Sequence, residues 1–426
     1  MRRRPTSSML RIAKHVTKLS NSNFPLGKKN AFYVLDKAVL HTNHQKWLQH
    51  LPRIKPHYAI KCNNDPAILQ TLGKYEGVGF DCASPNEMKD ALTYGNVASD
   101  QLLYAHPIKE EHNLLEARKM GVNRMTADSC EEIVKIATLH PEAEVMIRIR
   151  VDESSARCKL GSKFGASMDE VPNILRAAAL HAVNITGIAF HAGSGQRRPQ
   201  AFSDAVHLAR SAFDMGHDHG FKTSMKILNV GGGFVDDTGF EDVANALNSA
   251  INQCFGTTTG ANAEDGVSVI AEPGRFYVQE CLTLATCVIG RKERSNGKVQ
   301  LFINDSIYGS FNNIMFDHAK VHPEAIMSQC GTDLKYCNTS SDHVGGSVTV
   351  CGQTCDGLDI ICEQTSLARN VAVNDFLIFP SMGAYTSAAW SHFNGFERPE
   401  VLVVESEGDR IEKGVARNHV EREVEM

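Results

Sequence analysis

Eight short apolar runs follow one another between residues 57 and 275, and they decide the fold. They are HYAIK (57–61), VGFDCA (78–83), LLYAHP (102–107), RMTAD (124–128), VMIRIRV (145–151), ITGIAFHAG (185–193), KILNVGGG (226–233) and SVIAEPGR (268–275). Each run has the length of a strand. Between them lie stretches with helical periodicity, such as NEMKDALTYG and HNLLEARKMG, that end in glycine. Eight such alternations predict a (β/α)8 barrel, with a doubly wound open sheet as the alternative.

The pattern changes after residue 280. The runs CLTLATCVI, VQLFIND, SVTVCGQT, NDFLIFP and VLVVES have no long helical stretches between them, which predicts an antiparallel β domain. The early run AFYVLD (31–36) is expected to join that domain. The predicted organisation is therefore a disordered N-terminal tail at 1–23, a barrel at 38–280 and a β domain at 281–426 that is joined by 24–37. The charged last twenty residues are expected to fray.

Composition narrows the class of protein. The 426 residues are 42% hydrophobic and 22% charged, as in an ordinary globular protein, and the length suits two domains. A net charge of -5 favours neither nucleic acid nor an anionic membrane surface as a partner, and no apolar stretch is long enough to span a bilayer. The basic start, which lacks acidic residues before Asp36, fits a disordered tail better than a transit peptide.

Cysteine and histidine usage predicts a metal-free protein. The twelve cysteines form no CxxC pair, so we expect free thiols in a cytoplasmic protein rather than a zinc site. The sequence His217, Asp218, His219 closes a helical pattern just before a glycine. We interpret it as a solvated helix end and not as a set of metal ligands.

Reactive side chains gather where the predicted strands end, and in a barrel these ends form the functional face. The first run ends in Lys61, the second carries Asp81, and the sixth and eighth carry His191 and Glu272 near their ends. A single lysine after a strand is usually a surface group. A lysine that faces the same mouth as a carboxylate can do more, because it can form an imine while the carboxylate keeps a pyridinium nitrogen protonated.

Three glycine-bearing turns lie at the same ends. GSG (193–195), GGG (231–233) and PGR (273–275) offer backbone N–H groups without obstructing side chains, and phosphate sites in barrels use such loops. One glycine turn alone would be weak support, since turns use glycine for positive φ. Three of them beside a lysine and a carboxylate favour a pyridoxal-phosphate (PLP) site.

The motifs in their order resemble those of the eukaryotic ornithine decarboxylases. The matching runs are YAIKCNNDPAIL, GFDCAS, HAGSG, NVGGGF, AEPGRFYV, NDSIYGSFNNIMFDHA, CGQTCDGLD and MGAYTSAAWSHFNGF, which extend over roughly residues 24–406. The resemblance implies a barrel of the alanine-racemase type with a β domain, a PLP cofactor and a role in polyamine biosynthesis. It also implies a homodimer with active sites shared across the interface, and a possible interaction with antizyme.

The resemblance further assigns roles residue by residue. The catalytic set would be Lys61, which carries the cofactor as an imine, His191, which stacks on its ring, Glu272 at the ring nitrogen, and Cys355. The cofactor contacts would be Lys61, Asp81, His191, Ser194, Gly231, Gly232, Gly233, Glu272, Gly274, Arg275 and Tyr385. Asp317 would bind the distal ammonium of the substrate. The partner subunit would supply Cys355, to protonate Cα, and Asp356, to bind the distal amine; two carboxylates suit a cationic chain end.

Several positions depart from the family pattern and bear on the substrate. Lys159 stands where the family has arginine, and Arg157 lies two residues away as a possible substitute. The other departures are Ala192, Ser306, Phe316 and Trp390. The sequence leaves three functions open. The protein decarboxylates L-ornithine to putrescine, it decarboxylates lysine or another diamino acid, or it is a catalytically silent regulator similar to antizyme inhibitor. The complete set of cofactor residues favours an enzyme.

Overall fold

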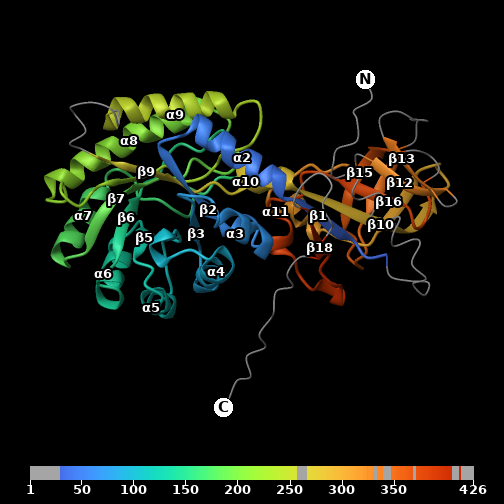
Figure 1. Ribbon diagram of the computed structural model, residues 1–426, viewed down its shortest axis with the longest axis horizontal. Helices are drawn as coiled ribbons and strands as arrows, with labels where there is room; N and C mark the ends of the chain where they lie inside the picture. Colours follow the sequence, from blue (N-terminus) through green and yellow to red (C-terminus); the bar gives the residue numbers. More distant parts are fainter. Residues whose placement is uncertain are drawn as a thin grey trace, which may run out of the picture.

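The computed structural model describes residues 29–256, 266–323, 325–330, 333–338, 347–367, 371–404 and 412–413. The predicted tail at 1–23 and the end of the chain after residue 413 lie outside these ranges. Figure 1 shows the barrel at one end of the molecule and the sheet of the β domain at the other, with the short helices α10 (Arg275–Val278) and α11 (Asn313–Phe316) between them.

Eight parallel strands close into a barrel in chain order. They are β2 (Ile54–Ala59), β3 (Gly79–Cys82), β4 (Leu102–Tyr104), β5 (Arg124–Ala127), β6 (Glu144–Arg148), β7 (Asn184–Ala189), β8 (Ile227–Asn229) and β9 (Ser268–Ala271). The ring closes where Ile54 of β2 pairs with Val269 of β9. All eight predicted runs therefore contain a strand, and the barrel, not the open sheet, is confirmed.

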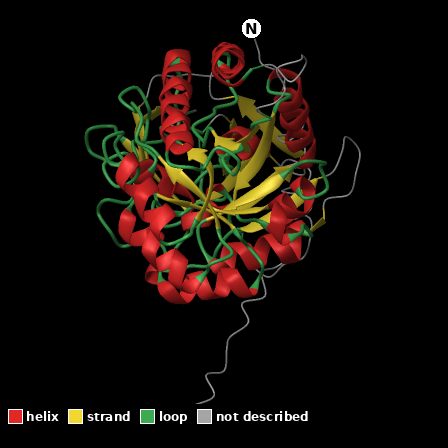
Figure 2. Cartoon of the chain, turned by 90° about the vertical axis from the view of Figure 1, so that its left-hand side faces the viewer, coloured by secondary structure: helices red, strands yellow, loops and turns green. Residues whose placement is uncertain are grey.

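Helices cover the barrel on the outside (Figure 2). They are α2 (Lys37–His50), α3 (Pro66–Leu72), α4 (Pro85–Asp90), α5 (Glu111–Lys119), α6 (Cys130–Leu139), α7 (Val171–Leu180), α8 (Pro199–Asp218) and α9 (Phe240–Phe255). Local sequence sets their starts: the Asp65 side chain accepts a hydrogen bond from the N–H of Ala67, and Ser129 caps α6 in the same way. Each amphipathic helix turns its apolar side to the strands, as α9 does with Val243, Leu247 and Ile251.

The β domain is built on the longest strand, β10 (Leu282–Glu293). Its other strands are β1 (Phe32–Asp36), β11 (Val299–Ile303), β12 (Ala325–Cys330), β13 (Asp333–Asn338), β14 (Ser347–Cys351), β15 (Ile360–Ser366), β16 (Phe376–Phe379), β17 (Glu400–Val404) and β18 (Glu412–Lys413). The run AFYVLD supplies β1, which lies in this sheet between β10 and β17. The pairs β1–β17 and β11–β14 are parallel, so the sheet is mainly but not wholly antiparallel.

The two parts meet at the mouth of the barrel. The chain leaves β9 through α10 (Arg275–Val278) and a 3-10 turn (Gln279–Cys281), and then enters β10. Segments of the β domain return to the barrel, where the N–H of Tyr385 donates to the carbonyl of Cys62 at 2.8 Å and the Asn63 amide donates to the carbonyl of Gly383 at 2.8 Å. These contacts join loops of the β domain to the turn that follows the first barrel strand.

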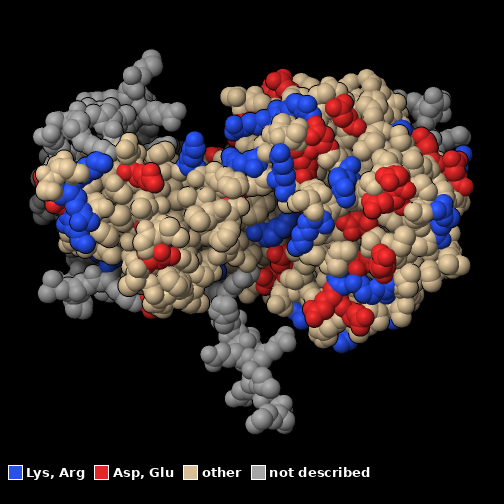
Figure 3. Space-filling model, turned by 180° about the vertical axis from the view of Figure 1, so that it is seen from behind, with Lys and Arg blue, Asp and Glu red and all other residues tan. Residues whose placement is uncertain are grey.

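Two observations concern the surface. Lysine and arginine side chains lie interspersed with aspartate and glutamate over the barrel on the face shown in Figure 3. Among the described residues, no helix combines the length and the apolar character needed to cross a membrane.

Candidate active site

Lys61 lies in a single 3-10 turn, Ile60–Cys62, that follows β2. The strand itself ends at Ala59, two residues earlier than the apolar run suggested. Ile60 and Cys62 are fully buried on either side, so the turn directs the lysine away from the core. Its side chain is 41% exposed and its ammonium forms an ion pair with Asp81, which is fully buried.

The charges around Lys61 keep it protonated. Partial loss of solvent around the ammonium lowers the pKa of Lys61, but the negative charges of Asp81 and Glu272 and the hydrogen bond to Asp81 outweigh this loss and raise the pKa above its usual value. A lysine in this state needs a proton acceptor before it can act as a nucleophile. Asp81, in direct contact with the ammonium, is placed to be that acceptor.

A cavity of about 370 Å³ opens above this turn. Its lining includes six of the residues predicted from the sequence: Lys61, His191, Ser194, Glu272, Asp317 and Tyr385. It also includes residues that the sequence reasoning missed, among them His106, Arg148 and Phe164. His106 is the last but one residue of the run LLYAHP, so the search for reactive groups at strand ends could have found it. Phe164 lies in the long β6–α7 loop, which carries no such signal.

His191 presents a neutral ring to the cavity. The N–H of Gly193 donates to Nδ1 of His191 at 3.0 Å, which places the ring proton on Nε2. Burial, with the nearby charges of Arg148 and Lys61, holds the pKa of His191 well below its usual value. A neutral, flat imidazole suits stacking against an aromatic ring better than a solvated cation would.

Glu272 is held by a buried asparagine that the sequence reasoning did not single out. The Asn229 amide donates to Oε1 of Glu272 at 2.7 Å, and Oδ1 of Asn229 accepts from the N–H of Gly231 at 2.9 Å. Burial, with the charge of Asp81, raises the pKa of Glu272 to about 7. A cationic partner such as a pyridinium nitrogen would stabilise the charged form of this carboxyl and lower its pKa again.

The GGG turn is a cradle that only glycine can form. A Cβ atom on Gly231, which has a φ of 64°, would lie 2.0 Å from the carbonyl oxygen of Phe190. A Cβ atom on Gly232 would lie 2.7 Å from Nε2 of His191 and 2.8 Å from the carbonyl oxygen of Glu272. Backbone therefore approaches the site more closely than any side chain would allow.

Arg275 is the buried cation beside this cradle. Its guanidinium donates to Oγ of Ser194 at 3.2 Å and to Oδ1 of Asp317 at 2.5 Å. It lies 5.1 Å from the centre of the Tyr385 ring. Burial lowers the pKa of Arg275, but the Asp317 charge outweighs it and raises the pKa. The guanidinium thus meets the hydroxyl of Ser194, at the GSG turn, in a place suited to a phosphate group.

Two buried polar atoms test whether a phosphorylated pyridine cofactor fits. Oδ1 of Asp81 and Nε of Arg275 have no hydrogen-bond partner among the described residues. One is an acceptor beside the amine of Lys61, and the other is a donor beside Ser194. The acceptor calls for a ligand with a hydrogen-bond donor near Lys61, and the donor, together with the glycine turn, calls for a phosphate oxygen.

Comparison with known proteins agrees with this geometry. The family described as pyridoxal-dependent decarboxylase, pyridoxal binding domain, matches residues 37–279. The chain belongs to the pyridoxal-dependent decarboxylases. It is 39% identical over 382 residues to an ornithine decarboxylase of Schizosaccharomyces pombe (89% of this chain, 84% of the relative). It is 40% identical over 396 residues to that of Rattus norvegicus (89% and 81%).

Solved structures give the same result. The arginine decarboxylase of Paramecium bursaria Chlorella virus, bound to agmatine, is 33% identical with a TM-score of 0.82 and covers 93% of this chain and 100% of its own. The lysine/ornithine decarboxylase of Vibrio vulnificus with cadaverine is 26% identical with a TM-score of 0.78, covering 94% and 100%. The predicted PLP cofactor, barrel and decarboxylase activity are confirmed.

In this decarboxylase, Cys355 and Asp356 do not line the cavity of their own chain. Cys355 is exposed, and its N–H donates to Oδ1 of Asn394 at 3.0 Å. Asp356 accepts hydrogen bonds from the N–H of Leu358, at 2.9 Å, and from the Tyr308 hydroxyl. These bonds, that of Leu358 first, lower the pKa of Asp356, so a charged carboxylate and a thiol stand together on the surface.

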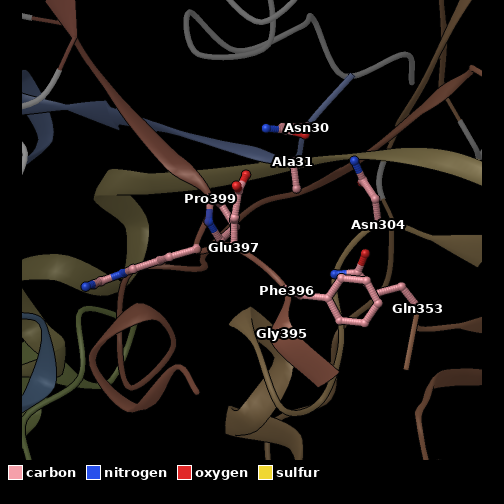
Figure 4. Close-up of a pocket in the computed structure, with 9 residues that line it drawn as sticks. Asn30, Ala31, Asn304, Gln353, Gly395, Phe396, Glu397 and Pro399 are labelled. Atoms are coloured by element: carbon pink, nitrogen blue, oxygen red, sulfur yellow. The ribbon is translucent and has the colours of Figure 1, made fainter. Parts of the chain in front are cut away.

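A second pocket, of about 280 Å³, lies in the β domain of the decarboxylase (Figure 4). Its lining includes Asn304, Gln353, Phe396 and Arg398. None of the predicted site residues lines it. The chemistry therefore points to the barrel cavity.

Proposed function

We propose that the protein converts L-ornithine to putrescine and CO2. The observation that carries the proposal is Asp317, a carboxylate only 5% exposed that lines the same cavity as Lys61. A buried carboxylate favours a cationic chain end and repels an acidic one. The identities of about 39% and 40% to ornithine decarboxylases support the same substrate.

The predicted residue roles fit this reaction. Lys61 would hold PLP covalently, Glu272 would face its ring nitrogen, and His191 would stack on the ring. Arg275, Ser194 and the N–H groups of the GGG turn would hold its phosphate. Bound PLP supplies an electron-accepting ring, which makes loss of CO2 from the α-carbon possible. The chain must then deliver a proton to that carbon.

We propose that the proton comes from Cys355 of a second copy, with Asp356 of that copy as a further partner for the distal amine. Two observations support a homodimer. The thiol and the carboxylate stand on the surface rather than in the cavity of their own chain. Apolar side chains beside them and at the mouth are exposed, with Leu358 at 70% and Phe316 at 78%.

Mixing two inactive variants tests the shared site. Lys61→Ala lacks the cofactor lysine and Cys355→Ala lacks the proton donor. If each site uses one residue from each subunit, equal amounts of the two variants, exchanged to equilibrium, regain about a quarter of wild-type activity, because half of the dimers then hold one complete site. A mixture that stays inactive while exchanging subunits would reject the shared site.

Decarboxylation of lysine is the second candidate, and the match to the Vibrio vulnificus lysine/ornithine decarboxylase favours it. A panel of L-ornithine, L-lysine and L-arginine at saturating PLP separates the two by CO2 release and product identification. The highest kcat/KM for ornithine supports the proposal, and a higher value for lysine overturns it. Retention of the cofactor residues argues against a silent regulator.

Two further predictions concern a protein partner and the location in the cell. Binding of antizyme stays a prediction. We propose a cytoplasmic location because the cysteines whose thiols are described are free and no disulfide joins any of them. Cell fractionation with an antibody against the chain tests this location.

A further inference from the structure

Arg157 reaches the carboxylate that we propose as the substrate's anchor. It lies in the loop between β6 and α7, where Cys158 and Ser194 exchange backbone hydrogen bonds of 3.1 Å and 3.0 Å. This bridge fixes the backbone next to Arg157 against the GSG turn. From there, Nη1 of Arg157 approaches Oδ2 of Asp317 to 3.4 Å.

Both oxygens of Asp317 are engaged. Oδ1 accepts from Arg275 at 2.5 Å and lies 3.5 Å from the Cys158 sulfur. Oδ2 faces Arg157. A distal ammonium that binds Asp317 must therefore displace one of these cations or share the carboxylate with it.

Arg275 and Arg157 differ in how easily they can move away from Asp317. Arg275 is 5% exposed and also contacts Ser194, Gln279 and the Tyr385 ring. The side chain of Arg157 is 32% exposed, and Asp317 is its only ion-pair partner among the described residues. Its contact is long and single, not the paired geometry that makes an arginine–carboxylate bond strong. Arg157 can exchange Asp317 for water at small cost.

We propose that Arg157 is a positioning residue that competes with the substrate's distal ammonium for Asp317. Without a ligand, Arg157 pairs with the Asp317 carboxylate. When a diamine or diamino acid binds, Arg157 moves out to solvent. Breaking the Arg157–Asp317 pair costs free energy, which weakens the binding of such ligands. This inference rests on the proposed function, because it takes Asp317 as the site of the distal ammonium.

The test replaces the charge and keeps the length. In Arg157→Met, the KM for ornithine falls about two- to fivefold, the range expected for a partly exposed ion pair, while kcat stays within twofold. Arg157→Lys keeps a cation at this position and leaves KM near that of the wild type. The matched control is Arg198→Met, because Arg198 pairs at 2.7 Å with Asp152, which does not line the cavity.

Amine binding gives a second readout that needs no turnover. Putrescine and n-butylamine are titrated against the PLP-loaded protein, and the absorption of the cofactor reports binding. Arg157→Met tightens putrescine about two- to fivefold and leaves n-butylamine unchanged, because only putrescine carries a second ammonium.

A KM that rises in Arg157→Met would overturn the inference, since Arg157 would then hold Asp317 in its binding position. Equal changes for the two amines would also overturn it, because the effect would not involve the second ammonium. If the wild type makes no putrescine from ornithine, the proposed function fails, and the amine titrations still decide the role of Arg157.

Discussion

Replacing Asp317 by asparagine tests the anchor for the distal ammonium. The substitution keeps the shape of the side chain and removes its charge, although asparagine can still accept a hydrogen bond. A hydrogen bond to a charged group contributes about 1.5–3 kcal/mol, and every 1.4 kcal/mol changes an equilibrium tenfold. Since Asp317 is 5% exposed, little solvent screening reduces this value. We therefore expect kcat/KM for ornithine to fall about 10- to 150-fold.

The assay measures CO2 release against ornithine concentration at saturating PLP. Most of the loss should appear as a higher KM, because the distal ammonium is bound in the ground state and in the transition state alike. The matched control is Asp237→Asn, since Asp237 pairs at 2.9 Å with Arg197 and does not line the cavity. The control should keep its kinetic constants within twofold.

Two results would refute this reasoning. A KM for ornithine within twofold of the wild type would show that the distal ammonium binds elsewhere. Loss of the bound cofactor's absorption in Asp317→Asn would show that Asp317 acts through its 2.5 Å contact with Arg275, and hence on the phosphate site.

Three further predictions concern the cofactor site. Lys61→Ala should abolish the absorption of covalently bound PLP together with decarboxylation; retained absorption would place the attachment elsewhere. Gly232→Ala should weaken PLP about 5- to 150-fold, because its Cβ atom meets His191 at 2.7 Å and overpacking costs about 1–3 kcal/mol; Gly239→Ala, with no atom closer than 3.4 Å, is the control in the same titration. The pKa of Glu272 rises from 4.5 to about 7 in the folded protein, so the folded state binds more protons than the unfolded chain and the stability of the PLP-free protein falls as pH rises across that interval. Glu272→Gln should flatten this part of the curve in urea titrations, and an unchanged slope would contradict the shift.

Regular alternation made the barrel predictable from sequence. The strands of the barrel are mostly buried and are bounded by polar or glycine residues. The regular spacing of these apolar runs along the sequence therefore indicates the alternation of strands and helices. The same regularity located the site, because reactive groups such as Lys61, His191 and Glu272 occur where strands end. The prediction from strand ends differs only in detail at Lys61, which lies two residues beyond β2 in a 3-10 turn that begins directly after the strand.

Contacts between distant segments were not predictable. In the sequence, nothing distinguishes Asn229 from the other residues of its apolar run. Its role is to donate a hydrogen bond to Glu272, which lies 43 residues further along the chain. The pairing of Arg157 with Asp317 spans 160 residues and two domains. The parallel pairing of β1 with β17 likewise follows from the chain's return to its first strand. None of these leaves a periodic pattern in the sequence.

The central claim is that this cavity decarboxylates a substrate with a distal ammonium, and ornithine in particular. Product identification after incubation of the PLP-loaded protein with L-ornithine, L-lysine and L-arginine tests it most directly. The account predicts putrescine and CO2 from ornithine, with the highest kcat/KM of the three. Cadaverine or agmatine formed with a higher kcat/KM, or no amine at all, would contradict it.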